Sequence, residues 1–248
     1  MGKTTTAINL AASLARTGSR VLLIDMDPQG NATVGSGLAM REIEQGIYEV
    51  LLGEIGVADG IVDTGVGYDM LPSHPDLSGA QVEMGELEKR DYRLDLALTE
   101  LGDRYDIILM DCPPALNVLT INALTAADEV LIPVQTEYYA LEGLTSLIET
   151  IDLITQGLNP QLKILGLVRT MFDGRNTLSI EVSDQLKTHF PDKLFRTVIP
   201  RNVRLAEAPS YGKPVLDYDR QCAGSQSYLA LASEVLRRTM PSTAGASA

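Results

Sequence analysis

Tryptophan is absent from this sequence of 248 residues, and only three phenylalanines, two cysteines and two histidines are present. The two cysteines, Cys112 and Cys222, exclude a disulfide framework and indicate a reducing compartment. The isolated His74 and His189 give no metal-binding motif. No apolar run reaches the roughly eighteen residues of a transmembrane helix, and the start lacks a basic and then apolar signal segment. We therefore expect a cytoplasmic protein with no membrane association.

Acidic residues outnumber basic ones, which gives a formal net charge of −13 at pH 7. This charge argues against a globally basic nucleic-acid-binding protein, but it leaves room for a local basic patch. The length suits one large domain with a substantial core. We expect that domain to span residues 1–240 and the small, polar segment 241–248 to be a disordered tail.

Short apolar runs alternate with helical patterns along the chain. Runs that are apolar on both faces are typical of strands in a parallel sheet covered by helices. The expected strands are residues 21–24, 105–111, 129–134, 164–168 and 194–199. The expected helices are residues 4–17, 94–102, 117–126, 140–156, 177–190 and 225–239. The alternation predicts an α/β fold with a doubly wound, mostly parallel sheet in three layers.

The first residues fit half of a phosphate-binding loop. Gly2-Lys3-Thr4 matches the last three positions of the pattern G-x-x-x-x-G-K-[ST], although such a tripeptide at a helix start is common. Asp27 follows an expected strand and Asp111 ends another, places where aspartate more often caps a helix or forms a turn. In doubly wound sheets, however, ligands bind beyond the carboxyl ends of the strands. Together these features predict a site for a magnesium-bound nucleotide.

A more specific resemblance is carried by residues 2–12, 25–33, 109–114, 133–143 and 199–210. In these stretches the chain resembles the ParA/Soj chromosome- and plasmid-partitioning ATPases, which belong to the deviant Walker-A clan that also contains MinD. The resemblance extends from Met1 to about residue 238, and Asp-Pro-Gln-Gly-Asn at 27–31 is specific to the Soj branch. It implies the fold of a P-loop NTPase, with ATP and Mg²⁺ as cofactors.

The phosphate-binding role falls on the first turn of the first helix. Lys3 is expected to contact the β and γ phosphate oxygens. The main-chain N–H groups of Gly2, Lys3, Thr4 and Thr5 are expected to cradle the phosphates at the helix N-terminus. Met1 stands at the preceding loop position and is included in the nucleotide site.

The remaining site residues are assigned to metal, water and base. The Thr4 hydroxyl is expected to ligate Mg²⁺, and Asp111, in the Walker-B role, to hold a water molecule of the metal shell. By resemblance, Asp27 positions or activates the attacking water, and Asp25 supports the metal shell. The residues that flank the adenine are, also by resemblance, Pro200 and Asn202. The catalytic set is therefore Lys3, Asp27 and Asp111.

The family loop reads Lys-Gly-Gly-Val-Gly-Lys-Thr, and Met1 stands where its valine would be. In the family the first lysine reaches across a dimer to the phosphates of the partner. We expect that the natural protein begins some tens of residues upstream, with a valine codon read here as the start. The alternative is a real truncation, which would remove a central strand and expose the edges of its two neighbours.

Basic residues gather in the last third of the chain, despite the acidic net charge. In Soj-like proteins two arginines make non-specific contacts with double-stranded DNA, and the resemblance places them at Arg175 and Arg204. It further implies an ATP-dependent homodimer on the nucleoid and a ParB-type partner that stimulates slow hydrolysis during chromosome or plasmid segregation. The alternative for each arginine is an ordinary solvated charge.

Three other functions remain to be weighed. A membrane-cycling ATPase of the MinD type needs a basic amphipathic C-terminal helix, whereas residues 225–239 are typical of a core-forming helix. An electron carrier like nitrogenase reductase needs cluster-binding cysteines, and Cys112 and Cys222 lie in no such motif. A DNA-bound scaffold that does not hydrolyse ATP becomes the alternative if the chain truly starts at Met1.

Overall fold

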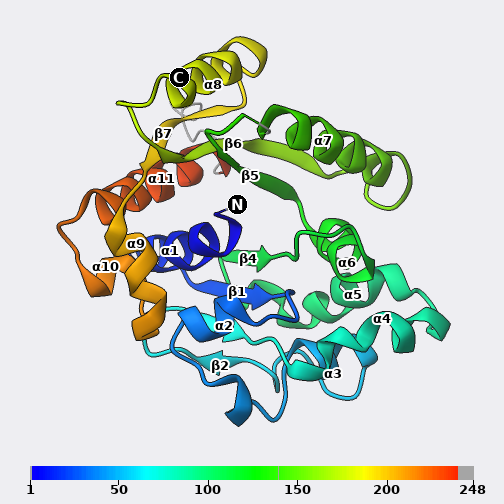
Figure 1. Ribbon diagram of the computed structural model, residues 1–248. Coiled ribbons are helices and arrows are strands. Elements are labelled where there is room, and N and C mark those ends of the chain that lie inside the picture. Colours follow the sequence, from blue (N-terminus) through cyan, green and yellow to red (C-terminus); the bar gives the residue numbers. More distant parts are fainter. Residues whose placement is uncertain (1, 139, 240–248) are drawn as a thin grey trace, which may run out of the picture.

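The computed structural model describes residues 2–138 and 140–239, so the predictions for Met1 and for the tail 241–248 lie outside the described residues. Strands and helices alternate along the described chain, and helices lie on both sides of the strands (Figure 1). The predicted α/β fold with mostly parallel strands is confirmed.

The described strands form two sheets. The first sheet has the order β2 (Val62–Asp63), β3 (Asp69–Leu71), β1 (Val21–Asp25) and β4 (Ile107–Asp111). The second sheet has the order β5 (Glu129–Gln135), β6 (Lys163–Phe172) and β7 (Leu194–Pro200). All neighbouring strands are parallel except β2 and β3. The five predicted strands are confirmed, whereas β2 and β3 were not predicted.

The division between the sheets falls between β4 and β5. Helix α1 (Lys3–Arg16) contacts β1, β4 and β5 and therefore spans the division on one face (Figure 1). Within the part of the chain that the structure describes, no strand pairs with the facing edges of β4 and β5. The start of α1 consequently lies at the junction of the two sheets.

The other α-helices are α2 (Asn31–Gly35), α3 (Ile47–Leu52), α4 (Ala80–Glu83), α5 (Arg93–Leu98), α6 (Val118–Ala126), α7 (Ala140–Gly157), α8 (Thr177–His189), α9 (Val203–Glu207), α10 (Val215–Tyr218) and α11 (Ala223–Thr239). Short 3₁₀ helices span Met40–Glu42, Pro75–Ser78, Met84–Glu86, Arg90–Tyr92, Thr99–Arg104 and Ala208–Tyr211. The prediction of one helix over residues 94–102 is wrong beyond Leu98. There α5 ends and a 3₁₀ segment follows, in which Gly102 leaves helical geometry at φ 49° and ψ −129°.

Successive residues of β1 supply the two faces of the first sheet, as the period of two in a strand requires. Val21 and Leu23 are buried in a core with α1 and α11. Leu22 and Ile24 are buried in a second core with α3, α5 and α6. A third core joins α7 and α8 to β5 and β6. The three-layer arrangement is therefore present.

Helix α11 confirms the interpretation of the C-terminal helix as core-forming. It contacts α1 and β7, and its inward stripe includes the buried Tyr228, Leu231, Ala232 and Val235. None of the described helices combines the length and the apolar character that crossing a membrane requires.

Candidate active site

The start of α1 has the geometry of an anion site. Gly2 precedes the helix with a left-handed backbone at φ 102°, and a Cβ at this position would lie 3.2 Å from the Thr170 hydroxyl oxygen. The first N–H groups of a helix have no intrahelical acceptor and carry partial positive charge. No acidic side chain lies in this first turn. The first turn that contains Lys3 and Thr4 therefore fits a phosphate.

Asp111 lies at the carboxyl end of β4, directly opposite Asp25 in the register of β1 and β4. Its side chain is buried, with a residue exposure of 2%, and an interaction with the Thr4 side chain favours its ionised form. Burial raises the pKa of Asp111 to about 7, and the charges of Asp25 and Asp27 add to this shift while Lys3 opposes it. The structure thus brings five residues predicted for the site into one electrostatic group.

Asp25 is fully buried at the end of β1 and accepts three hydrogen bonds. Its Oδ1 accepts from the main-chain N–H of Asp27 at 3.1 Å. Its Oδ2 accepts from the main-chain N–H and the hydroxyl of Thr33, each at 2.8 Å. Burial raises the pKa of Asp25 to about 6, although these hydrogen bonds favour the ionised form. A metal would have to compete with three donors for this carboxylate.

Asp27 is half-buried and follows β1 by two residues. Its Oδ1 accepts from the main-chain N–H of Gln29 at 3.0 Å, which closes an Asx turn. Its carbonyl oxygen accepts from Gly30 N at 2.9 Å and from the Ser73 hydroxyl at 2.8 Å. The main chain of Asp27 is therefore held, while its Oδ2 forms no hydrogen bond among the described residues.

Two further residues, Thr33 and Ser73, contact the carboxylates of this site and were not predicted from the sequence. Thr33 lies in a stretch that carried the family resemblance, but it received no role. Ser73 follows β3, a strand of only three residues that the sequence pattern did not show. Both side chains are fully buried and polar, and both reach Asp25 or Asp27 through hydrogen bonds that span many residues of sequence.

The donor set fits Mg²⁺ bound together with a nucleotide, not a metal held by protein alone. Among residues 2–138 and 140–239, no three His, Cys, Asp or Glu side chains are grouped closely enough to hold a metal. Mg²⁺ commonly takes one or two protein oxygens and fills its shell with waters and phosphates. Among the described residues the buried Asp111 Oδ2 has no hydrogen-bond partner, and the Thr4 side chain lies beside the same carboxylate. An orphaned buried carboxylate oxygen requires such a partner.

Pro200 and Asn202 lie at the carboxyl end of β7. Pro200 pairs with Phe172 of β6, and the Asn202 side chain caps α9 by accepting from Arg204 N at 2.9 Å. The buried Asn9 of α1 accepts from Val215 N at 2.7 Å and so joins the first helix to the start of α10. Contact of Pro200 and Asn202 with the adenine stays a prediction.

Arg175 and Arg204 are exposed and already paired with carboxylates. Arg175 donates to both carboxylate oxygens of Asp173 at 3.0 Å, and these bonds lower the pKa of Asp173 to about 2. Arg204 pairs with Glu207 at 2.8 Å and with Asp219 at 3.4 Å. Exposed pairs of this kind contribute little stability and are screened by salt. Phosphates could therefore replace the carboxylates at modest cost.

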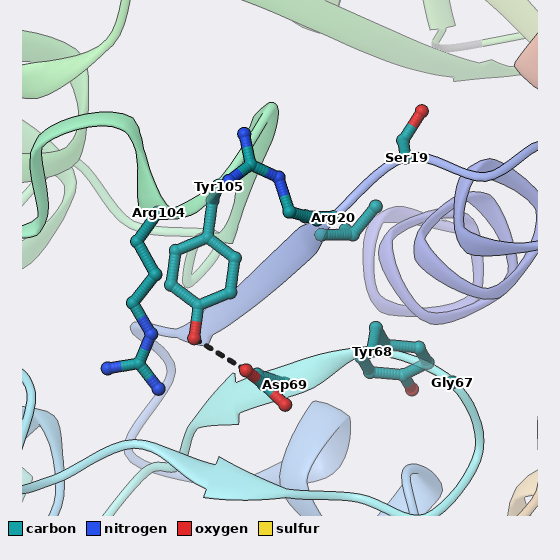
Figure 2. A pocket seen from close by; sticks show the side chains of 8 residues that line it. Ser19, Arg20, Gly67, Tyr68, Asp69, Arg104 and Tyr105 are labelled. Atoms are coloured by element: carbon teal, nitrogen blue, oxygen red, sulfur yellow. Dashed lines mark hydrogen bonds between the residues drawn. The ribbon is translucent and has the colours of Figure 1, made fainter.

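A hollow of about 310 Å³ lies at the opposite, amino end of the first sheet (Figure 2). Its polar groups are largely paired with one another or with neighbours. The Tyr105 hydroxyl donates to Asp69 at 2.6 Å, as Figure 2 shows, and Arg20 donates to the adjacent Asp106 at 2.6 Å. This hollow holds none of the residues predicted for the site.

Comparison with known proteins identifies a family model and close relatives of this chain. A family model described as an AAA domain matches residues 1–164. The chromosome partitioning protein ParA of Caulobacter vibrioides is 53% identical over 241 residues, which cover 96% of this chain and 90% of that protein. The sporulation initiation inhibitor protein Soj of Bacillus subtilis is 50% identical, with 95% and 93% of the two chains covered.

A solved structure supports the same relationship at the level of the fold. It is the cobyrinic acid a,c-diamide synthase from Mycobacterium smegmatis with bound ADP and magnesium, which is 34% identical to this chain. The two superpose with a TM-score of 0.84 over 95% of this chain and 89% of the other. With half of its residues shared with ParA and Soj proteins over nearly its whole length, the chain belongs to the ParA/Soj family of partitioning ATPases.

Proposed function

We propose that the protein is an ATP-dependent partitioning ATPase whose ATP-bound dimer binds DNA non-specifically and whose hydrolysis a ParB-type partner stimulates. The observation that carries the ATPase part is the orphaned Oδ2 of Asp111, buried beside Thr4 and Lys3 at the start of α1. ATP and Mg²⁺ are the cofactors that suit this site. The related synthase of Mycobacterium smegmatis, whose solved structure contains ADP and magnesium, supports the assignment.

In this proposal the residues around α1 bind the nucleotide and neutralise its charge. The main-chain N–H groups of residues 2–5 and the Lys3 ammonium face the phosphates. The Thr4 hydroxyl and Asp111 would hold Mg²⁺, which would supply positive charge to the phosphates. The charge of a bound cation would also offset the cost of ionising the Asp111 carboxyl, whose pKa burial raises to about 7.

Asp27 acts on the attacking water. Its carboxylate keeps one oxygen in the Asx turn and leaves the other available to orient or deprotonate a water molecule. Asp25 contributes indirectly in this geometry, because it holds the N–H of Asp27 and the first turn of α2. Phosphoryl transfer to water depends mainly on positioning and charge stabilisation, which is what these contacts provide.

The dimer and its partner complete the proposed cycle. A positive charge supplied across a dimer, or by a partner, is worth about 10³- to 10⁵-fold in related nucleotide switches, so the isolated protein is expected to be slow. ATP then acts as a timer that holds the dimer on nucleoid DNA until hydrolysis releases it. Doubling of the surface around Arg175 and Arg204 in a dimer would offset the acidic net charge locally.

DNA retention tests this function. Charge reversal of Arg175 and Arg204 should abolish ATP-dependent retention of non-specific double-stranded DNA while leaving the unfolding temperature and ATP hydrolysis in place. Arg20→Glu is the matched control, since this exposed arginine is also paired with an aspartate but lies at the amino end of the sheet. Retention by the double variant at the wild-type level would discard the DNA assignment.

Assays of ATP hydrolysis, DNA retention and liposome retention on the same protein samples distinguish the proposed function from its two alternatives. Retention on DNA without hydrolysis of ATP would indicate the scaffold alternative. ATP-dependent retention on anionic liposomes, with none on DNA, would indicate a membrane-cycling ATPase. The proposal requires hydrolysis, DNA retention and no liposome retention.

A further inference from the structure

Ser73 reaches the site because of the register of β1 and β3. These strands are parallel, with Ile24 opposite Leu71, so the residues that follow them emerge at the same edge of the sheet. Ser73 is fully buried there. Its hydroxyl donates to the carbonyl oxygen of Asp27 at 2.8 Å, and its main-chain N–H donates to the Thr33 hydroxyl oxygen at 2.9 Å. Ser73 thus joins two segments that flank the site.

Thr33 continues this connection to Asp25. Its hydroxyl accepts from Ser73 N and donates to Asp25 Oδ2 at 2.8 Å, so both capacities of the hydroxyl are used. Its main-chain N–H donates to the same oxygen. Thr33 is the third residue of α2, whose N-cap is Gly30 without a capping side chain. The Asp25 carboxylate therefore accepts the N–H hydrogen bond that the side chain of an N-cap residue would accept at the start of α2.

The main chain of Asp27 is consequently held by hydrogen bonds at both its N–H and its carbonyl oxygen. Its N–H donates to Asp25 Oδ1, and its carbonyl oxygen accepts from the Ser73 hydroxyl. Neither the Thr33 nor the Ser73 hydroxyl forms a hydrogen bond to α1 within the described residues. Their contacts serve Asp27 and Asp25, and not the turn that faces the phosphates.

We propose that Ser73 and Thr33 are positioning residues that hold the main chain of Asp27, so that its carboxylate stays aimed at the attacking water. This inference rests on the proposed ATPase function and adds two residues to its catalytic apparatus. Displacement of a catalytic group by about 1 Å can cost about 100-fold in rate. Loss of either hydroxyl should therefore lower turnover and leave ATP binding nearly unchanged.

The kinetic test uses Ser73→Ala and Thr33→Val, with Thr33→Ser as the conservative variant that keeps the hydroxyl. We expect kcat to fall by about 10- to 100-fold in the first two, with KM for ATP changed by less than about threefold, and Thr33→Ser to restore most of the rate. Ser36→Ala is the matched control. Ser36 is equally buried near the end of α2, but it bonds to Ala32 and Tyr68, away from the carboxylates.

A second measurement does not depend on turnover. Amide hydrogen exchange of residues 26–30 in the nucleotide-free protein should be faster by about tenfold or more in Ser73→Ala, and unchanged in Ser36→Ala. If the wild type hydrolyses ATP but Ser73→Ala keeps its kcat and its exchange protection, the positioning role is refuted while the ATPase function stands. If the wild type binds no ATP, the proposed function fails, and the exchange result still decides whether Ser73 holds the Asp27 segment.

Discussion

Replacement of Asp111 by asparagine should stabilise the metal-free protein, and increasingly so as the pH rises. The wild-type carboxyl is buried with an orphaned oxygen, and its pKa is raised from 3.8 to about 7. Each pKa unit corresponds to 1.36 kcal/mol, so the ionised carboxylate costs the folded state roughly 4 kcal/mol well above pH 7. Asparagine has nearly the same shape and no charge, so it removes this cost.

The raised pKa of Asp111 determines how the free energy of unfolding of the wild type changes with pH. Below pH 3.8 the carboxyl is protonated in both the folded and the unfolded state, and it does not affect stability. Between 3.8 and about 7 the unfolded state loses its proton first, so the wild type loses stability as the pH rises. Any unsatisfied amide in the variant costs the same at every pH. The stability difference should therefore grow in favour of Asp111→Asn by roughly 2 to 3 kcal/mol between pH 5 and pH 8.

Urea unfolding in EDTA at pH 5 and pH 8 measures this difference for both proteins. Asp106→Asn is the control, because hydrogen bonds from Arg20 lower the pKa of this exposed carboxyl to about 2. Asp106 is ionised in both states at either pH, so its variant should show a difference that does not change between them. A difference for Asp111→Asn that is equally independent of pH would refute the electrostatic reasoning.

Three further changes test other parts of the structure. Asp173→Asn releases Arg175 from its ion pair and should tighten DNA retention at low salt in a filter-binding titration; equal or weaker retention would contradict the role of this arginine. The Glu234 carboxylate accepts three hydrogen bonds from β7, and Glu234→Gln replaces one of its two acceptor oxygens by an amide nitrogen. This variant should therefore lower the free energy of unfolding in urea by about 1 to 3 kcal/mol. Gly30→Ala forces a side chain onto φ 63° and should lower the melting temperature, whereas Gly85→Ala, which meets open space, should not; equal melting temperatures would remove the constraint.

The sequence predicted the parts of the fold that have a local pattern. Residues 21–24 are apolar on both faces, and the corresponding strand β1 is fully buried between two helical layers. In contrast, β3 has only three residues and begins with the polar Asp69, so no periodic signal marks it. The division of the strands into two sheets depends on pairing between distant segments, which the local pattern does not contain.

In the candidate site, too, only residues with a local sequence pattern could be predicted. Lys3, Thr4 and Asp111 could be predicted because a loop motif and a strand end have recognisable sequences, and the structure brings these three residues together. Ser73 could not be found in this way. Its role comes from a hydrogen bond to a residue 46 positions earlier in the chain, and its side chain is an ordinary serine in the sequence.

The most direct test of the account measures ATP binding and ATP hydrolysis in the same samples of wild type, Asp27→Ala and Lys3→Ala. The proposed roles require Asp27→Ala to bind Mg²⁺-ATP with nearly wild-type affinity but to hydrolyse it poorly, and Lys3→Ala to lose productive binding. Wild-type turnover in Asp27→Ala, or equal loss of binding in both variants, would contradict the separation of a water-positioning carboxylate from a phosphate-binding helix start.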